Sequence, residues 1–296
     1  MFHSTKTMAR TAGFTIIELL IAITLTTIVV TVFISATTTM VRSVTVEKTQ
    51  LELSQKNQVA LDILERDIRM ALAFDTTVSY STFVDKYGPT NTDQTWSGAW
   101  SYKGSNPSDP DHRVLILRET ATSTNPLRVS RTPVYVDGHS TTAYAIQDLN
   151  LNCTTYNAST APTGALTYNP ALPYYLIYFV RDNNLYRRTL TDTSTTLCNG
   201  PQYQKQSCPE VDTTPYATCQ AYDELIATDV GSFTVAYNTV VSSGGTTTIT
   251  DIDAYSQSAS DIFQDINNAV VTLKLQKIVY GADRGTTLSV RVSRVN

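Results

Sequence analysis

Residues 14–41 read FTIIELLIAITLTTIVVTVFISATTTMV, and this stretch decides how the chain is organised. From residue 19 to residue 41 the chain runs for 23 residues without a charge. About 20 apolar residues are enough for a helix to cross the hydrocarbon of a bilayer, so the stretch predicts a transmembrane helix. Lys6 and Arg10 precede it with no acidic residue nearby, which predicts a cytoplasmic amino end and an external remainder.

Glu18 does not fit a plain membrane anchor. It lies at the start of the apolar run, where a carboxylate is costly and is by default a sign of function. Such a group needs a cationic partner, and residues 11–41 contain no lysine or arginine. The candidate partner is an amino group that proteolysis creates just before Glu18.

The segment Arg10-Thr11-Ala12-Gly13-Phe14-Thr15-Ile16-Ile17-Glu18-Leu19-Leu20-Ile21-Ala22 resembles the processing signal of type IV prepilins and pseudopilins. The resemblance implies that a prepilin peptidase cuts between Gly13 and Phe14, and that Phe14 is then N-methylated. It also implies that Glu18 pairs with the amino terminus of a neighbouring subunit. The helix would then pack against other major and minor pilins, and a buried pair of this kind specifies register more than it adds stability.

Two other interpretations of the apolar run are open. An ordinary secretory signal would be cut near Ser35 and Ala36, but its apolar core is shorter and does not begin with glutamate. A plain signal anchor explains the length of the run and leaves Glu18 unexplained.

The helix is expected to continue beyond the membrane to about Phe74. No glycine or proline occurs between Phe14 and Tyr87, so the usual helix breakers are absent. The outer part has an apolar face with helical spacing, formed by Leu61, Leu64, Ile68 and Ala71 with Leu72 alongside. The predicted organisation is a leader at residues 1–13, a transmembrane and assembly helix at 14–41, its continuation at 42–74 and a β-rich external head at 75–296.

The head is expected to be an antiparallel sheet. Residues 114–117 form a buried-strand candidate. Three hairpins are predicted at residues 174–190, 232–250 and 269–295, with turns at 181–184, 242–245 and 281–285. A long helix followed by consecutive hairpins predicts an α+β fold, with the sheet packed on the outer half of the helix and extra loops around it.

The order of elements also resembles the larger minor pilins of the PilW-like and PulJ/GspJ-like kinds. The matching segments include residues 61–69, 184–188 and 224–233. Removal of the leader would leave 283 residues, which is longer than a typical major pilin. The resemblance therefore implies a minor subunit that helps to initiate or cap a filament.

The four cysteines, Cys153, Cys198, Cys208 and Cys219, all fall in the predicted external head. An oxidising compartment favours disulfides, and four cysteines allow three pairings. We expect Cys208 to pair with Cys219 and Cys153 with Cys198, and free thiols are the alternative.

Trp96 and Trp100 lie in a long polar loop and are candidates for binding a sugar, a surface or a partner subunit. The simpler interpretation is that they hold the loop against the body. The pairs Asp109 with Asp111 and Asp251 with Asp253 do not continue into a calcium loop, so no metal or cofactor is expected.

The composition favours a structural role over catalysis. A net charge of −4 argues against non-specific nucleic-acid binding, and no hydrolase, zinc-protease or phosphate-binding motif occurs. The preferred hypothesis is a single-pass, cleaved and methylated subunit of a type IV pilus or a related pseudopilus, including a type II secretion pseudopilus. The alternative is a membrane-anchored adhesin or receptor for a surface or DNA at a filament tip. An anchored enzyme using His112 or His139 is a more distant third.

Overall fold

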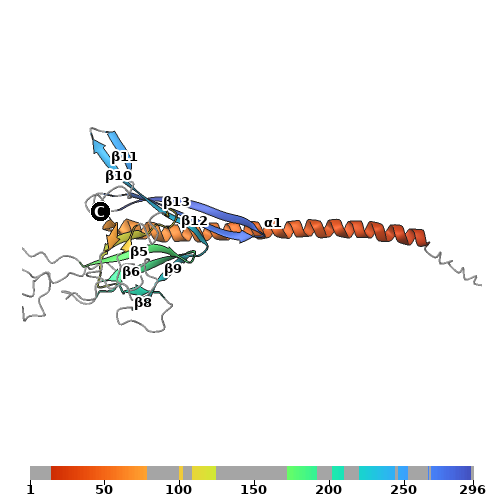
Figure 1. Cartoon of the computed structure of the whole chain (residues 1–296), viewed down its shortest axis with the longest axis horizontal. Coiled ribbons are helices and arrows are strands. Elements are labelled where there is room, and N and C mark those ends of the chain that lie inside the picture. The colour runs from red at the N-terminus through yellow and green to blue at the C-terminus, as the bar shows by residue number, and fades with distance from the viewer. Residues whose placement is uncertain are drawn as a thin grey trace, which may run out of the picture.

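The computed structural model describes residues 15–78, 100–102, 109–124, 172–191, 202–209, 220–243, 246–252, 266 and 268–294. One long helix, α1 (Ile16–Met70), extends from a body built of two antiparallel sheets (Figure 1). The first sheet has the order β1 (Ala73–Asp75), β4 (Leu115–Thr120), β5 (Pro173–Arg181), β6 (Asn184–Thr191) and β9 (Glu224–Ala227). The second has the order β11 (Thr246–Ile252), β10 (Val230–Ser243), β12 (Asn268–Val279) and β13 (Ala282–Ser293). This is an α+β fold of the predicted pilin-like kind.

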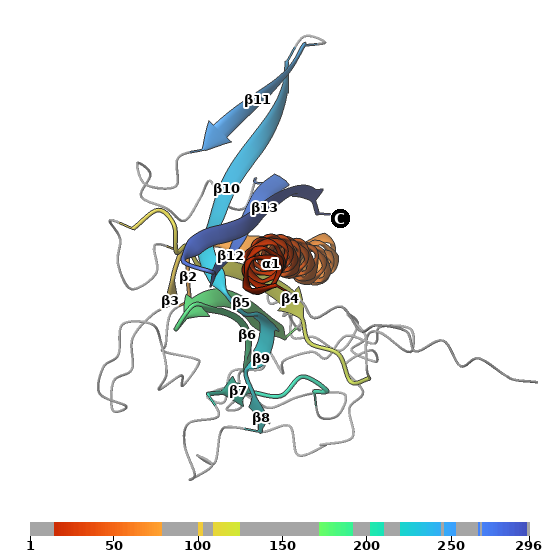
Figure 2. The ribbon, with the colours of Figure 1, turned by 90° about the vertical axis from the view of Figure 1, so that its right-hand side faces the viewer.

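The outer half of α1 lies between the two sheets, which corrects the expectation of one sheet packed on the helix. Figure 2, which looks along α1, shows β12 and β13 on one side of the helix and β4, β5 and β6 on the other. One core cluster accordingly joins Leu64 and Ile68 of α1, Leu117 of the first sheet and Leu273 of the second. The helix is therefore the central element of the core.

The predicted apolar face of the helix is confirmed at Leu61, Leu64, Ile68 and Ala71, all of which are buried. Leu72 does not belong to it and is 54% exposed. The helix ends at Met70 and not near Phe74, because Ala71 is already extended and Ala73–Asp75 pairs with β4 as β1. Phe74 thus reaches the core from a strand, and strand pairing with a distant segment overrides the local preference for helix.

The three predicted hairpins are present. Asp182 and Asn183 connect β5 to β6 with φ of 51° and 56°, the left-handed conformation that a two-residue hairpin turn requires. In the β10–β11 hairpin, Ser242 and Ser243 were expected in the turn, but they are the last residues of β10 and pair with Thr247 and Thr246. The β12–β13 turn is shorter than predicted, because Tyr280 and Gly281 alone form it, and Gly285 lies within β13 opposite Gln276.

The first sheet is buried on both faces. On its outer face Ile116, Ile177 and Phe179 form a second core cluster with Trp100. Trp100 belongs to β3 (Trp100–Ser101), which pairs with β2 (Thr77–Val78). A further short parallel pair, β7 (Ser207–Cys208) with β8 (Ala221–Tyr222), lies beside β6.

Candidate functional site

Glu18 helps to cap the amino-terminal end of α1. Its carboxylate accepts hydrogen bonds from the Thr15 backbone N–H and hydroxyl, both at 3.2 Å, and its own N–H donates to the Thr15 hydroxyl at 3.3 Å. This is a capping box, which satisfies backbone donors that the first turn of a helix leaves free. Sequence reasoning missed this second role, although the signal, Thr followed three residues later by Glu before an apolar run, was present. Gly13 and Phe14 lie outside the described residues.

The first half of α1 carries its apolar side chains on the outside. Ile16, Leu25 and Phe33 are 86%, 58% and 70% exposed, and the other large apolar side chains of this half are similarly exposed. The helix is long and apolar enough to cross a membrane, and no part of its most hydrophobic 18-residue segment is buried within the described part of the chain. Water is therefore a poor solvent for this surface, and lipid or a bundle of apolar helices is the environment that suits it.

The threonines of this half are suited to the same environment. Their hydroxyls donate to backbone carbonyls three or four residues earlier, at 2.7–2.9 Å in Thr24, Thr26, Thr27, Thr31, Thr37 and Thr39. A hydroxyl bonded within its own helix needs no partner from lipid. The threonine-rich sequence is thus compatible with a continuous membrane-spanning helix.

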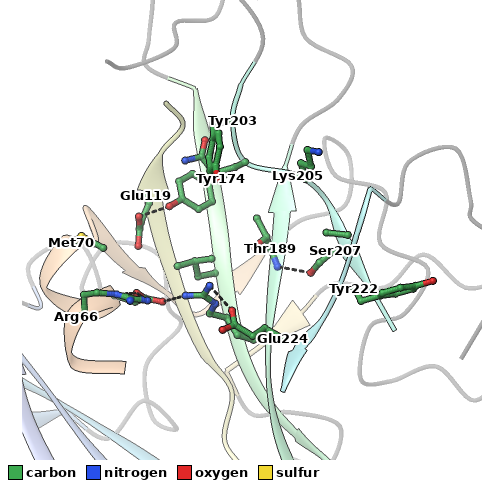
Figure 3. Close-up of a pocket in the computed structure, with 15 residues that line it drawn as sticks. Arg66, Met70, Glu119, Tyr174, Thr189, Tyr203, Lys205, Ser207, Tyr222 and Glu224 are labelled. Carbon is green, nitrogen blue, oxygen red and sulfur yellow. Dashed lines mark hydrogen bonds and ion pairs between the residues drawn. The ribbon is translucent and has the colours of Figure 1, made fainter. Parts of the chain in front are cut away.

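A cleft of about 500 Å³ opens beside the end of α1, the first sheet and the β7–β8 pair (Figure 3). Tyr203 and Tyr222 line it and are 48% and 65% exposed. On its wall the Tyr174 hydroxyl donates to the carboxylate of Glu119. Among the residues that the structure describes, no group of three or more His, Cys, Asp or Glu side chains is arranged to hold a metal ion.

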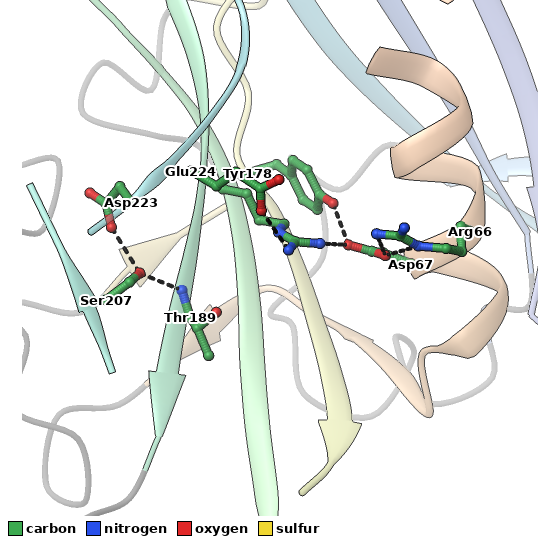
Figure 4. Close-up of polar contacts among 8 residues, drawn as sticks. Arg66, Asp67, Tyr178, Thr189, Ser207, Asp223 and Glu224 are labelled. Atoms are coloured by element: carbon green, nitrogen blue, oxygen red, sulfur yellow. Dashed lines mark hydrogen bonds and ion pairs between the residues drawn. The ribbon is translucent and has the colours of Figure 1, made fainter. Parts of the chain in front are cut away.

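The inner end of the cleft joins α1 to the first sheet through Asp67 (Figure 4). Asp67 is 1% exposed and accepts hydrogen bonds from the Tyr178 hydroxyl and from Arg187 Nη1, both at 2.6 Å, and from Arg66 Nε at 2.9 Å. Arg187 also bonds Glu224 at 2.6 Å. Burial raises the pKa of Tyr178 well above its usual value, and the charge of Asp67 adds to the effect. These charges are used to fix the helix on the sheet.

Trp100 is not available as a surface-binding residue, which corrects the hypothesis of a binding loop. Its side chain is fully buried, its ring centroid lies 4.8 Å from that of Phe179, and the guanidinium of Arg188 lies 5.3 Å from its centroid. Trp100 therefore holds β3 against the first sheet, as the simpler interpretation expected. Trp96 lies outside the described residues.

Cys208 is buried and takes part in a disulfide. Cys153, Cys198 and Cys219 lie outside the described residues, so the pairing of Cys208 with Cys219 and of Cys153 with Cys198 stays a prediction. The neighbouring Ser207 fixes β7 to β6, because its hydroxyl accepts the Thr189 N–H at 2.8 Å and donates to Asp223 at 2.9 Å (Figure 4).

His112, a candidate for the enzymatic alternative, is bonded locally. Its Nδ1 lies 2.7 Å from Asp109 Oδ2, and Asp109 also accepts the Asp111 N–H at 2.9 Å. The hydrogen bond to His112 lowers the pKa of Asp109. His139 and Asp253 lie outside the described residues.

The sequence around the start of α1 carries the decisive similarity. Residues 8–34 match the prokaryotic N-terminal methylation motif. The match includes Gly13, Phe14 and Glu18 and extends into the exposed apolar half of α1. No curated protein and no solved structure matches the chain.

This motif supports a type IV pilin-like or pseudopilin subunit. It implies processing by a prepilin peptidase and assembly with other pilins, and it indicates a structural subunit. The exposed apolar helix near the amino terminus fits a membrane-anchored prepilin.

Proposed function

We propose that this chain is a minor subunit of a type IV pilus or a related pseudopilus, cut between Gly13 and Phe14 and methylated on Phe14. The first half of α1 anchors the subunit in the cytoplasmic membrane and later packs against other subunits, while the head stays outside. One observation carries the proposal: residues 8–34 match the methylation motif and include the start of α1. The first half of this helix is apolar and exposed, and its second half packs between two sheets.

Glu18 acts twice in this proposal. Before assembly its carboxylate caps its own helix through Thr15, at 3.2 Å. The capping bonds join the charged carboxylate to neutral donors, whereas an ammonium group adds a full positive charge and bonds a carboxylate at about 2.7–2.9 Å. The methylated amine of Phe14 on a neighbouring subunit would therefore be a better partner, and Glu18 would specify the axial register of the helices.

The size of the chain supports a minor role, since 283 residues would remain after cleavage. The alternative of an adhesin or receptor that binds through the tryptophan loop loses one of its two residues, because Trp100 is buried. A subunit whose main task is assembly is therefore favoured.

Mass spectrometry of the mature chain from its native host tests the processing step. We expect a polypeptide that begins at methylated Phe14. A chain that begins near Thr37 would instead identify an ordinary cleaved secretory signal, and one that keeps residues 1–13 in a purified fibre would exclude processing.

Substitutions at Glu18 test the assembly step and separate its two roles. Glu18→Val is expected to insert into the membrane but to be missing from sheared fibres, and Glu47→Val, at an exposed position outside the apolar run, should assemble normally. Glu18→Gln keeps the capping hydrogen bonds and loses the charge. If Glu18→Gln assembles as well as the wild type, capping suffices and the charge-pair mechanism is wrong.

A further inference from the structure

The β12–β13 hairpin runs beside α1 towards the amino terminus, further than the other strands labelled in Figure 1. In its middle, Asn57 of α1 donates to the Leu273 and Thr286 carbonyls at 2.9 and 3.3 Å. At its end, the guanidinium of Arg42 lies 5.7 Å from the centroid of the Tyr280 ring. From Arg42 to Asn57 the helix rises about 22 Å, and from Leu273 to Tyr280 the strand extends about 23 Å. The hairpin therefore lies along the helix axis, and its turn is level with Arg42.

Arg42 is the first charged residue after the apolar run that begins at Leu19. At 1.5 Å per residue this run is about 35 Å long, and the hydrocarbon of a bilayer is about 30 Å thick. When the run spans a membrane, Arg42 lies at the outer edge of the hydrocarbon or in the headgroup layer. Because Tyr280 contacts Arg42, the turn of the hairpin lies in the same layer.

The side chains at this turn differ from those in the rest of β12. Leu273 and Leu275 point into the core and are fully buried, whereas Ile278 and Tyr280 are 76% and 60% exposed. Tyrosine is enriched where membranes meet water, because its ring suits the hydrocarbon edge and its hydroxyl suits the headgroups.

The charges near the turn are mostly positive. Lys277 and Arg284 lie directly opposite one another across the hairpin, an arrangement that is unfavourable in water. Asp283, in β13 opposite Ile278, is an acidic residue close to the turn, and the nearby Glu52 is already bonded to Lys56 at 2.9 Å. Together with Arg42, these cations would be attracted to the anionic headgroups of a membrane surface.

We infer that the turn of the β12–β13 hairpin, Ile278 and Tyr280 with Arg42, rests in the headgroup layer of an anionic membrane before assembly. This inference rests on the membrane span of the proposed function. The contact fixes the depth of α1: Glu18 lies about 36 Å along the helix from Arg42, which places it at the opposite edge of the hydrocarbon. There the adjoining cleavage site is accessible to a membrane peptidase.

Tryptophan fluorescence of the full chain tests the contact in vesicles of phosphatidylethanolamine and phosphatidylglycerol, at low protein density. Tyr280→Trp places a probe at the turn, and Tyr222→Trp places one at a similarly exposed site (65%) on β8, away from the turn (Figure 1). Trp96 and Trp100 contribute equally to both variants, and the wild-type signal is subtracted. We expect lipids with brominated acyl chains to quench the added fluorescence of Tyr280→Trp at least about twofold more than that of Tyr222→Trp.

A second variant protects the test against misfolding at the turn. Adding Ile278→Glu to Tyr280→Trp places a negative charge beside the probe. It should remove most of the extra quenching, while the protein still floats with the vesicles. Equal quenching of the two tryptophan probes would overturn the inference. A fluorescence of Tyr280→Trp that changes only when the protein density rises would also overturn it, because it would identify a contact between subunits. Co-flotation with the vesicles separates the two proposals. If the protein floats with the vesicles but the fluorescence of Tyr280→Trp is not quenched, only this inference is refuted. If the protein does not float with the vesicles, the membrane anchoring of the proposed function is refuted as well.

Discussion

Replacing Asp67 by asparagine tests how the helix is fixed to the head. The carboxylate is buried and binds the Tyr178 hydroxyl and Arg187 Nη1, both at 2.6 Å. Asparagine has nearly the same shape, so the substitution removes the charge and leaves the packing. Arg187 then keeps Glu224, whose side chain is 51% exposed, as its acidic partner.

The expected loss follows from the burial of the pair. Removing one partner of a buried ion pair costs about 3–5 kcal/mol, because the other charge stays buried and uncompensated. Arg187 is 22% exposed and keeps its contact with Glu224, so we expect the lower end of this range, about 3 kcal/mol in the free energy of unfolding. In a double-mutant cycle with Arg187→Gln, the coupling energy should be about 1–2 kcal/mol.

Denaturant unfolding of the full chain in detergent micelles measures this loss, with the fluorescence of the buried Trp100 reporting on the head. Asp62→Asn is the matched control, because Asp62 lies on the same helix and is exposed. It should change the free energy of unfolding by less than about 0.5 kcal/mol. If Asp67→Asn costs no more than Asp62→Asn, the network does not fix the helix to the sheet and the reasoning fails.

Three further substitutions, one of them with a control, test the core, a turn and a half-buried acid. Leu64→Ala, at a fully buried position between the sheets, should lower the free energy of unfolding by about 2–5 kcal/mol. Leu51→Ala, where the side chain is 61% exposed, should cost far less, and equal losses would contradict the central place of α1 in the core. Gly281→Ala should cost about 1–2 kcal/mol in the same assay, since φ of +77° is unfavourable for a residue with a Cβ, and an unchanged midpoint would argue against this turn. Burial raises the pKa of Asp75 above 3.8, so its ionised form costs stability at neutral pH. Asp75→Asn should therefore be more stable than the wild type at pH 7. The difference in free energy of unfolding between the two should shrink as the pH falls through the folded pKa of Asp75 towards 3.8. A difference that does not depend on pH would refute this explanation.

Much of the fold could be predicted from the sequence because the signals were local. The uncharged run from Leu19 to Val41 and the absence of glycine and proline predict a long helix. Asp182 and Asn183 mark a hairpin turn because these residue types tolerate positive φ. The same holds for the candidate site, where Gly13, Phe14 and Glu18 lie within six consecutive positions.

Other features could not be predicted because they depend on distant segments. Phe74 belongs to a strand because β4 pairs with it, and Trp100 is buried because β3 covers the outer face of the first sheet. Asn57 and Asp67 share the apolar helical face with Leu64, and that position was a signal that they are buried. Their partners are far away in sequence and lie on four different strands: Leu273 on β12, Thr286 on β13, Tyr178 on β5 and Arg187 on β6.

The sequence by itself determined the apolar helix, the methylation motif and the acidic residue within it, because hydrophobicity, charge and short spacing act over a few neighbouring residues. Tertiary structure alone decided that two sheets enclose the helix, that Asp67 is paired with Arg187 in the core and that Tyr280 lies beside Arg42. Each of these depends on strands that bring together segments separated by more than a hundred residues, and the free energy of such contacts exists only once the chain has folded.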